Sequence, residues 1–301
     1  MTLKQYAVVW FKAARAPFLV VSIIPSILAG LIVWSHGSID ATLFWLVTIG
    51  VVMAHSAGDF VDDYFDFKKG NLGNKEKQFH DSPLIDGTVT ARQVMVAALL
   101  CVAIALATGI YAFSVVGMPV VWLTILGTVI VFFYTSPPLM LNYRGLGETA
   151  LFVAFGPMIV GGISYVLRPV FDWEPLLASI PLGIFTMNVG LVSNTFDHDD
   201  DVKSGKRTLP VRFGQAAAVR VLAAGSVFAY AVIVAGVALN VLTPWSLIAL
   251  LGSPLAFTVV KATSQYHDTA HYTGAMTKAI ALTSVTGILL CVAYGMVVLM
   301  R

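Results

Sequence analysis

The chain has 301 residues, of which 58% are apolar and only 11% are charged, and its net charge is +2. A soluble domain carries about 25% charged residues. This composition, with a mean hydropathy of +0.84, therefore excludes a soluble globular enzyme, a disordered chain and a nucleic-acid-binding protein with a broad basic face. The two cysteines, Cys101 and Cys291, lie inside apolar runs, which indicates buried apolar side chains and excludes a disulfide scaffold.

Nine apolar runs follow one another along the chain, each close to the roughly 20 residues that a helix needs to cross a bilayer. Proline and glycine occur inside several runs, which membrane helices tolerate, and the alternation of a barrel strand is absent. The sequence therefore predicts an all-α, polytopic membrane protein with a single membrane-embedded domain over residues 1–301. The predicted spans are residues 17–35, 41–58, 93–113, 119–136, 149–167, 176–194, 216–239, 243–261 and 277–299.

Basic residues lie almost entirely on one side of the predicted membrane. Of the 18 Lys and Arg residues, 16 fall near the N-terminus or beside the connections that follow even-numbered spans, including Lys75 and Lys77. Only Arg168 and Arg301 fall on the other side. Because Lys and Arg mark cytoplasmic loops, we expect a cell-membrane protein whose N-terminus and long connections are cytoplasmic and whose C-terminus is outside.

Two long connections, residues 59–92 and 195–215, interrupt the apolar pattern and hold 11 of the 16 acidic residues. In the first connection, Asp59, Asp63 and Asp66 are spaced i, i+4, i+7. If the second span continues as a helix, these three carboxylates fall on one face of it.

The second connection repeats the pattern, with Asp197 and Asp201 at i, i+4. One acidic cluster at the end of a span is more often a solvated helix end, but two clusters, each followed by basic residues, favour a site. Like charges at this spacing repel, and carboxylates beside a membrane are unfavourable without compensation. Mg²⁺ removes both penalties, since it binds oxygen ligands and typically joins one or two carboxylates to a substrate phosphate. The clusters therefore predict a Mg²⁺–diphosphate site at the cytoplasmic mouth of a helical bundle, and their 135-residue offset predicts two four-helix halves plus a ninth helix.

A third polar segment begins at Tyr134, where Pro137 and Pro138 end the fourth span. The segment reads as a simple turn between helices, and from this turn Arg144 could still reach a phosphate.

Four motifs, in order along the chain, resemble the UbiA superfamily of intramembrane prenyltransferases. They lie at residues 62–70, 83–87, 134–148 and 194–211. The likeness is greatest to the menaquinone branch, which prenylates 1,4-dihydroxy-2-naphthoate. It implies nine helices around a central cavity, with Mg²⁺ joining two Asp-rich motifs to an allylic prenyl diphosphate. The implied reaction is transfer of the prenyl group to an aromatic acceptor, with membrane lipid around the protein and no nucleic-acid partner.

The resemblance also implies roles for individual residues. The helical spacing predicts Asp59 as a metal ligand, and the resemblance implies Asp63, Asp66, Asp197 and Asp201 as the others. The last four of these are also the implied catalytic residues, together with Tyr134, whose ring could stabilise an allylic cation. The predicted substrate-binding residues are Arg15, Lys68, Lys69, Arg144, Asn194, Lys203, Lys206 and Arg207.

The chain departs from the family pattern at four places, and every departure makes the site more negative or less positive. Asp59 and Asp62 stand where the family usually has Asn, while Ser82 and Phe196 stand where it often has Arg. Other acceptors therefore stay open, namely 4-hydroxybenzoate or a glyceryl phosphate ether-lipid precursor. Outside enzymes, the alternatives are a secondary transporter and a Mg²⁺ channel. A transporter would place its acids near the midplane, whereas these acids lie toward one membrane face. A channel would not need the adjacent Lys and Arg.

Overall fold

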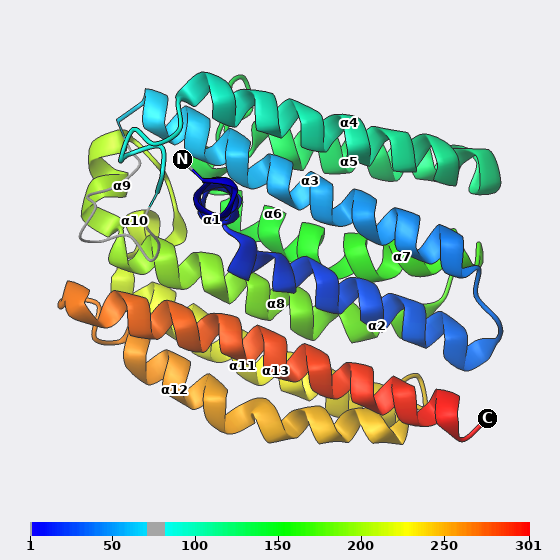
Figure 1. Cartoon of the computed structure of the whole chain (residues 1–301). Coiled ribbons are helices and arrows are strands. Elements are labelled where there is room, and N and C mark those ends of the chain that lie inside the picture. The colour runs from blue at the N-terminus through cyan, green and yellow to red at the C-terminus, as the bar shows by residue number, and fades with distance from the viewer. Residues whose placement is uncertain (1, 71–81) are drawn as a thin grey trace.

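The computed structural model describes residues 2–70 and 82–301, so Lys75 and Lys77 lie outside the described part of the chain. The described residues form helices and connecting turns, without a strand. The long helices run side by side in one bundle, with the C-terminus at the end opposite to α9 and α10 (Figure 1). In the described residues, eight helices are long and apolar enough to cross a membrane, which confirms the predicted all-α membrane architecture.

The helices that cross the bundle are α2 (Val20–His36), α3 (Ala41–Lys68), α4 (Ala91–Val116), α5 (Met118–Phe133), α6 (Gly147–Val153) with η4 (Ala154–Met158) and α7 (Ile159–Leu167), α8 (Trp173–Phe196), α11 (Gln215–Ala238), η5 (Pro244–Gly252) with α12 (Ser253–Thr263), and α13 (Tyr272–Leu299). The short elements at its ends are α1 (Leu3–Ala13), η1 (Ala16–Leu19), η3 (Leu141–Arg144), α9 (His198–Ser204), α10 (Leu209–Phe213) and η6 (Thr269–His271).

Two predicted boundaries differ from the structure. The fourth predicted span is the shorter apolar helix α5, with 16 residues, so nine crossing helices is an approximate description: eight full-length spans and α5. The second predicted span was ended at residue 58, but α3 continues to Lys68. The first acidic cluster is therefore helical, and Asp63 and Asp66 are buried on the inward face of α3, where cations compensate them as described below.

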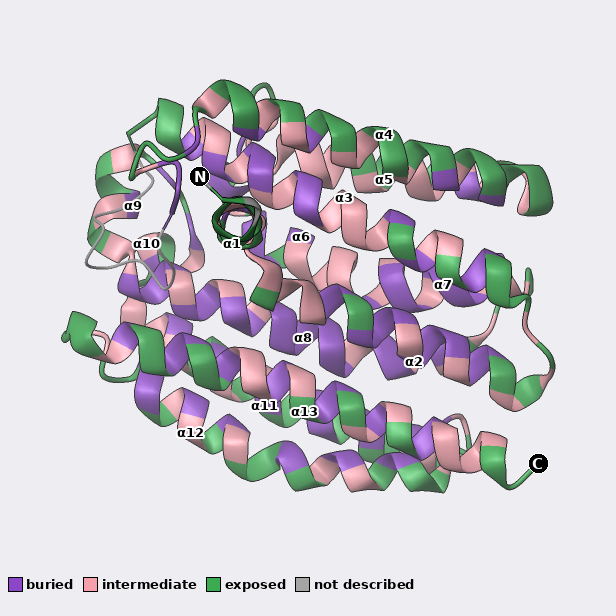
Figure 2. Ribbon diagram, in the orientation of Figure 1, coloured by how far each residue is buried: buried purple, intermediate pink, exposed green. Residues whose placement is uncertain are grey.

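Helix α8 is the most buried of the candidate spans and lies in the middle of the bundle (Figure 2). It meets the chain between α6 and α7, where η4 is a single π-helical turn that contains Pro157. A Cβ atom at Gly183 of α8 would lie 2.7 Å from the carbonyl oxygen of Phe152, and one at Gly156 would lie 2.9 Å from the Cα of Gly183. The two backbones are therefore in direct contact, which only glycine allows.

We expect Gly183→Ala to destabilise the protein by about 1–3 kcal/mol, because the added methyl group forces apart two backbones in a packed interior. Gly295→Ala in α13 is the matched control, since a Cβ there meets nothing within 4 Å, and it should gain up to about 1 kcal/mol in helix propensity. Unfolding in mixed detergent micelles measures both. If Gly183→Ala is as stable as Gly295→Ala, the backbone contact is wrong.

Candidate active site

A central cavity of about 520 Å³ lies among α3, α4, α5, α7 and α8, within the size range of small-molecule sites. Its wall on α3 extends from Val47 to Asp66, a distance of about 28 Å at 1.5 Å per helical residue. One end of the cavity is lined by carboxylates from both acidic clusters, and most of the remaining wall is apolar. The cavity therefore combines a charged mouth with a long apolar interior.

Arg15 compensates the first acidic cluster. It lies between α1 and η1 in a left-handed conformation, with a φ angle of 45°. Its guanidinium donates a hydrogen bond to Asp63 and lies 3.6 Å from an oxygen of Asp62 and 4.0 Å from one of Asp59. Burial alone would lower the pKa of Arg15, but the three carboxylates outweigh it and raise that pKa above its usual value. The guanidinium therefore stays charged at the mouth of the cavity.

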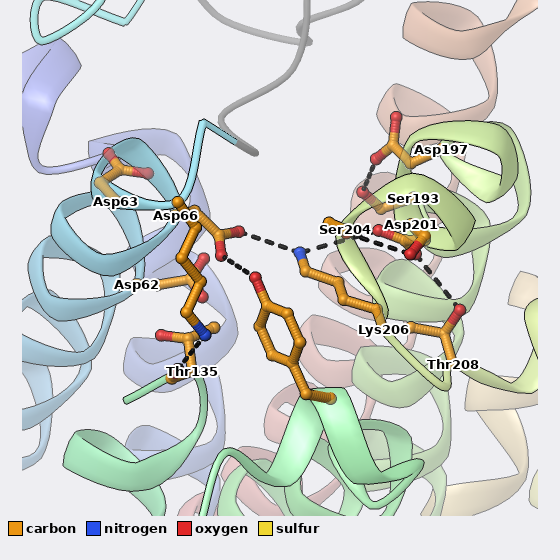
Figure 3. A network of polar contacts seen from close by, with 12 residues as sticks. Asp62, Asp63, Asp66, Thr135, Ser193, Asp197, Asp201, Ser204, Lys206 and Thr208 are labelled. Carbon is orange, nitrogen blue, oxygen red and sulfur yellow. Dashed lines mark hydrogen bonds and ion pairs between the residues drawn. The ribbon is translucent and has the colours of Figure 1, made fainter. Parts of the chain in front are cut away.

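Lys206 joins the two acidic clusters. Its Nζ donates to Oδ2 of Asp66 at 2.9 Å and lies 3.7 Å from Oδ1 of Asp201 (Figure 3). The other oxygens of these carboxylates accept hydrogen bonds from the Tyr143 hydroxyl, at 3.1 Å, and the Thr208 hydroxyl, at 3.2 Å. Segments far apart in the sequence, α3 and α9, are thus connected through one buried ammonium group.

A helix C-cap directs Lys206 inward. Helix α9 ends at Gly205, which has a φ of 76°, a left-handed conformation that suits glycine. The backbone N–H of Lys206 then donates to the carbonyl oxygen of Asp201 at 2.9 Å. Lys206 is buried, whereas Lys203 before the cap and Arg207 after it are exposed.

Burial and charge act in opposite directions on Lys206 and Asp201. Burial would lower the pKa of Lys206, but Asp66 and Asp201 outweigh it and raise that pKa above its usual value. Burial raises the pKa of the Asp201 carboxyl to about 7, and the Lys206 ammonium limits that rise. The pair therefore depends on both partners: removing either one would leave a buried charge uncompensated.

The second acidic cluster is held by the end of α8. Asp197 is the C-cap of α8 and the N-cap of α9, and its Oδ2 accepts a hydrogen bond from the Ser193 hydroxyl at 3.0 Å. One turn earlier, Asn194 donates to Oε1 of Glu148 at 3.0 Å, and the same oxygen accepts from the N–H of Leu209. These bonds fix the loop that carries Lys206 relative to α6 and α8.

The structure brings together most of the predicted site residues. Those that line the central cavity are Arg15, Asp59, Asp63, Asp66, Tyr134, Asn194, Asp197, Asp201 and Lys206. Those outside the described lining are Lys68, Lys69, Arg144, Lys203 and Arg207.

Three of these outlying side chains have partners elsewhere. Arg144 donates to the carbonyl oxygen of Pro138, and Lys203 pairs with Asp200 at 3.2 Å. Lys69 Nζ lies 3.7 Å from the centroid of the Tyr143 ring, so Lys69 contacts Tyr143, the residue whose hydroxyl donates to Asp66.

Four further polar residues of this region were not among the predicted site residues. His55 and Ser22 line the cavity and form a hydrogen bond of 2.7 Å, with His55 Nε2 3.6 Å from Asp59. Tyr143 and Glu148 position Asp66 and Asn194. Tyr143 and Glu148 lie in the motif at residues 134–148, which marks them as candidates, whereas no spacing rule links Ser22 to His55.

The carboxylates at the mouth fit a hard divalent cation. Asp59 Oδ2 and Asp62 Oδ1 are buried without a hydrogen-bond partner, and Mg²⁺ prefers oxygen ligands of this kind. Within residues 2–70 and 82–301, one group of three His, Asp or Glu side chains has its possible metal-ligand atoms within 4.8 Å of one another. That group is His36, Asp172 and Glu174, away from the mouth. At the mouth, the two cations Arg15 and Lys206 set the separation of the carboxylates.

Comparison with known proteins agrees with this geometry. A profile of the UbiA prenyltransferase family matches residues 23–273. The 1,4-dihydroxy-2-naphthoate octaprenyltransferase of Mycobacterium tuberculosis is 30% identical over 82% of this chain and 83% of that protein. The protein of the same name from Bacillus subtilis is 25% identical over 84% of this chain and 81% of that protein.

Two solved structures share the fold. The apo structure of a UbiA homolog from Aeropyrum pernix K1 matches with a TM-score of 0.70 at 18% identity, covering 94% of this chain and 98% of that one. A UbiA homolog from Archaeoglobus fulgidus bound to DMAPP and Mg²⁺ matches with a TM-score of 0.59 at 14% identity, covering 97% and 99%. The chain thus belongs to the UbiA prenyltransferase family. It is a multi-pass membrane prenyltransferase.

We expect Lys206→Met to weaken binding of an allylic diphosphate by about tenfold to a hundredfold, because a hydrogen bond to a charged group contributes roughly 1.5–3 kcal/mol. Arg207→Met, at the exposed neighbouring position, should change it by less than about twofold. Titration with an unreactive thio-analogue of geranyl diphosphate measures both. Equal losses in the two variants would contradict the placement of Lys206.

Proposed function

We propose that this chain transfers a prenyl group from an allylic polyprenyl diphosphate to 1,4-dihydroxy-2-naphthoate, with Mg²⁺ held by the two acidic clusters, in menaquinone biosynthesis. The observation that carries the proposal is the central cavity, which joins both clusters to a long apolar interior. The naphthoate prenyltransferases that match most of the chain support the acceptor. The Archaeoglobus homolog bound to DMAPP and Mg²⁺ supports the donor and the metal.

In this proposal the charged mouth binds the diphosphate. Arg15 and Lys206 both line it, and they can donate hydrogen bonds to phosphate oxygens. The residues that would hold the metal are Asp59, Asp63 and Asp66 from α3 and Asp197 and Asp201 from the second cluster, with the partnerless oxygen of Asp62 beside them. When bound, Mg²⁺ neutralises charge on the departing diphosphate.

The apolar interior then protects the allylic cation. The electrons of the breaking C–O bond leave with the diphosphate, and an electron-rich ring carbon of the acceptor supplies the electrons of the new C–C bond. That ring carbon then loses the group it carried, a proton or the carboxylate as CO₂, and the electrons of the broken bond restore the aromatic ring. Water would quench the cation, and an apolar cavity excludes water. The rings of Tyr134, Phe155 and Tyr272 line the cavity, and aromatic faces stabilise a nearby cation.

The position of the acids favours an enzyme over a transporter. Transporter sites lie near the midplane of the bilayer, whereas Asp59 to Asp66 occupy the last turns of α3. The deciding experiment is an acceptor panel in detergent with labelled octaprenyl diphosphate. We expect Mg²⁺-dependent product with 1,4-dihydroxy-2-naphthoate and little with 4-hydroxybenzoate or glyceryl phosphate. Product with one of the other acceptors would replace this assignment, and no product with any of them would contradict the function.

Asp63→Asn and Asp197→Asn test whether the two clusters act on one diphosphate. Each change should reduce turnover on the order of a hundredfold or more, because it removes an anionic ligand from the charge-stabilising site. The double variant should lose much less than the product of the single losses, since residues that act as a unit are not additive.

Raised Mg²⁺ should partly restore the single variants. Asp199→Asn is the control, because its side chain is 83% exposed. Near-normal turnover in either single variant, with the protein folded, would remove the two-cluster site.

We further propose that the protein lies in the cell membrane with the charged mouth facing the cytoplasm, as the distribution of basic residues predicts. In a background without Cys101 and Cys291, cysteine at position 203 should react with an impermeant maleimide only in inverted vesicles. Lys203 suits this test because its side chain is 76% exposed. Cysteine at position 301 should react in intact cells. The reverse labelling would overturn this orientation.

A further inference from the structure

A second pocket, of about 400 Å³, lies between α2, α5, α7 and α8, at the opposite end of the bundle from the acidic clusters. Its wall is largely apolar and includes Ile32, Pro157 and Leu176. It shares two lining residues with the central cavity, Leu123 of α5 and Gly162 of α7. The two spaces are therefore neighbours across a thin partition.

The two residues that line both spaces are a side chain, Leu123, and a bare backbone, Gly162. Gly162 has no side chain, and a Cβ atom there would lie 3.5 Å from Cδ1 and 3.6 Å from Cδ2 of Leu123. Leu123 is partly exposed rather than locked in the core. A change of rotamer in a leucine is fast and small, so the side chain can move to connect the two spaces without a movement of the helices.

The second pocket faces the lipid on its outer side. Trp122 and Phe171 line it and are 66% and 64% exposed on a chain that crosses a membrane. The rim also carries the ion pair between Arg168 and Asp172, at 2.6 Å. A path thus leads from the charged mouth through the apolar interior and past Leu123 to the bilayer.

We propose that the second pocket binds the distal isoprene units of long-chain donors and products, and that Leu123 determines which chain lengths are accepted. This inference rests on the proposed function, which places the diphosphate at the mouth. A long chain that starts at Asp66 and fills the interior reaches Val47 and Val166 at the deep end. The hydrophobic effect alone does not favour binding of the prenyl tail in the second pocket, because lipid is as apolar as the pocket. The pocket binds the tail rather than a lipid chain because it is continuous with the central cavity, where the diphosphate is held.

Leu123→Trp tests this partition, with Leu126→Trp as the matched control. Leu126 lies on the same helix, is 44% exposed and lines neither space. For each protein, the measurement is kcat/KM with octaprenyl diphosphate divided by kcat/KM with geranyl diphosphate. We expect this ratio to fall about tenfold or more in Leu123→Trp, in the range that a blocked apolar subsite produces, and to stay unchanged in Leu126→Trp. An unchanged ratio in Leu123→Trp would overturn the proposal.

A second measurement covers the case in which Leu123→Trp fails to fold or the wild-type protein proves inactive. An unreactive octaprenyl thio-diphosphate with a diazirine at its far end is photolysed on the wild-type protein. Labelling at residues that line the second pocket and not the central cavity, such as Trp122, Tyr165 and Leu176, supports the proposal. Labelling confined to other residues overturns it, and so does labelling at these residues by a control chain that has the diazirine but no diphosphate. Absence of transfer to any acceptor contradicts the proposed function, whereas the labelled position reports on the tail site separately.

Discussion

The arrangement of this protein depends on the compensation of carboxylates at one end of an apolar bundle. Asp63, Asp66 and Asp201 are buried, and like charges this close repel strongly where water is scarce. Two cations, both contributed by turns rather than by the spanning helices, offset this repulsion. Arg15 pairs with Asp59, Asp62 and Asp63, and Lys206 pairs with Asp66 and Asp201. The left-handed conformations at Arg15 and Gly205 are what bring these cations to the carboxylates.

The same compensation explains why the mouth suits a metal diphosphate. A bound Mg²⁺ would add positive charge beside the carboxylates, and a diphosphate would add negative charge beside Arg15 and Lys206. Binding both Mg²⁺ and the diphosphate therefore changes the net charge of the mouth less than binding either one alone. In the proposed function, metal and diphosphate therefore bind best as a pair, while an isolated anion or cation meets an already paired site. Arg15 and Lys206 are the Lys and Arg residues of the described lining.

Pattern alone predicted the spans and the two clusters, because bilayer thickness and helical periodicity act on short stretches of sequence. It ended the second span at residue 58, since no local pattern shows that Arg15 compensates Asp59, Asp62 and Asp63 and that Lys206 compensates Asp66 where α3 continues. It also treated Lys206 and Arg207 alike, although the C-cap at Gly205 directs only Lys206 inward. The contact of Ser22 with His55 depends on how α2 packs against α3, which no local pattern encodes. The division into two four-helix halves stays a prediction.

The apolar interior exists because side chains are missing from its wall. Gly58, Gly109, Gly127 and Gly162 line the central cavity, and a Cβ atom at any of them would lie at least 3.5 Å from its nearest described neighbour. Helices in lipid gain little from burying apolar surface and associate through close packing, so an internal space must be kept open against that tendency. Larger residues at these positions would fill it: a Cβ atom at Gly127 would already lie 3.5 Å from Cε of Met158. Where glycine faces a neighbouring helix, as Gly156 and Gly183 do, it closes the bundle instead. The same residue type thus serves opposite purposes, and the face of the helix on which it lies decides which one.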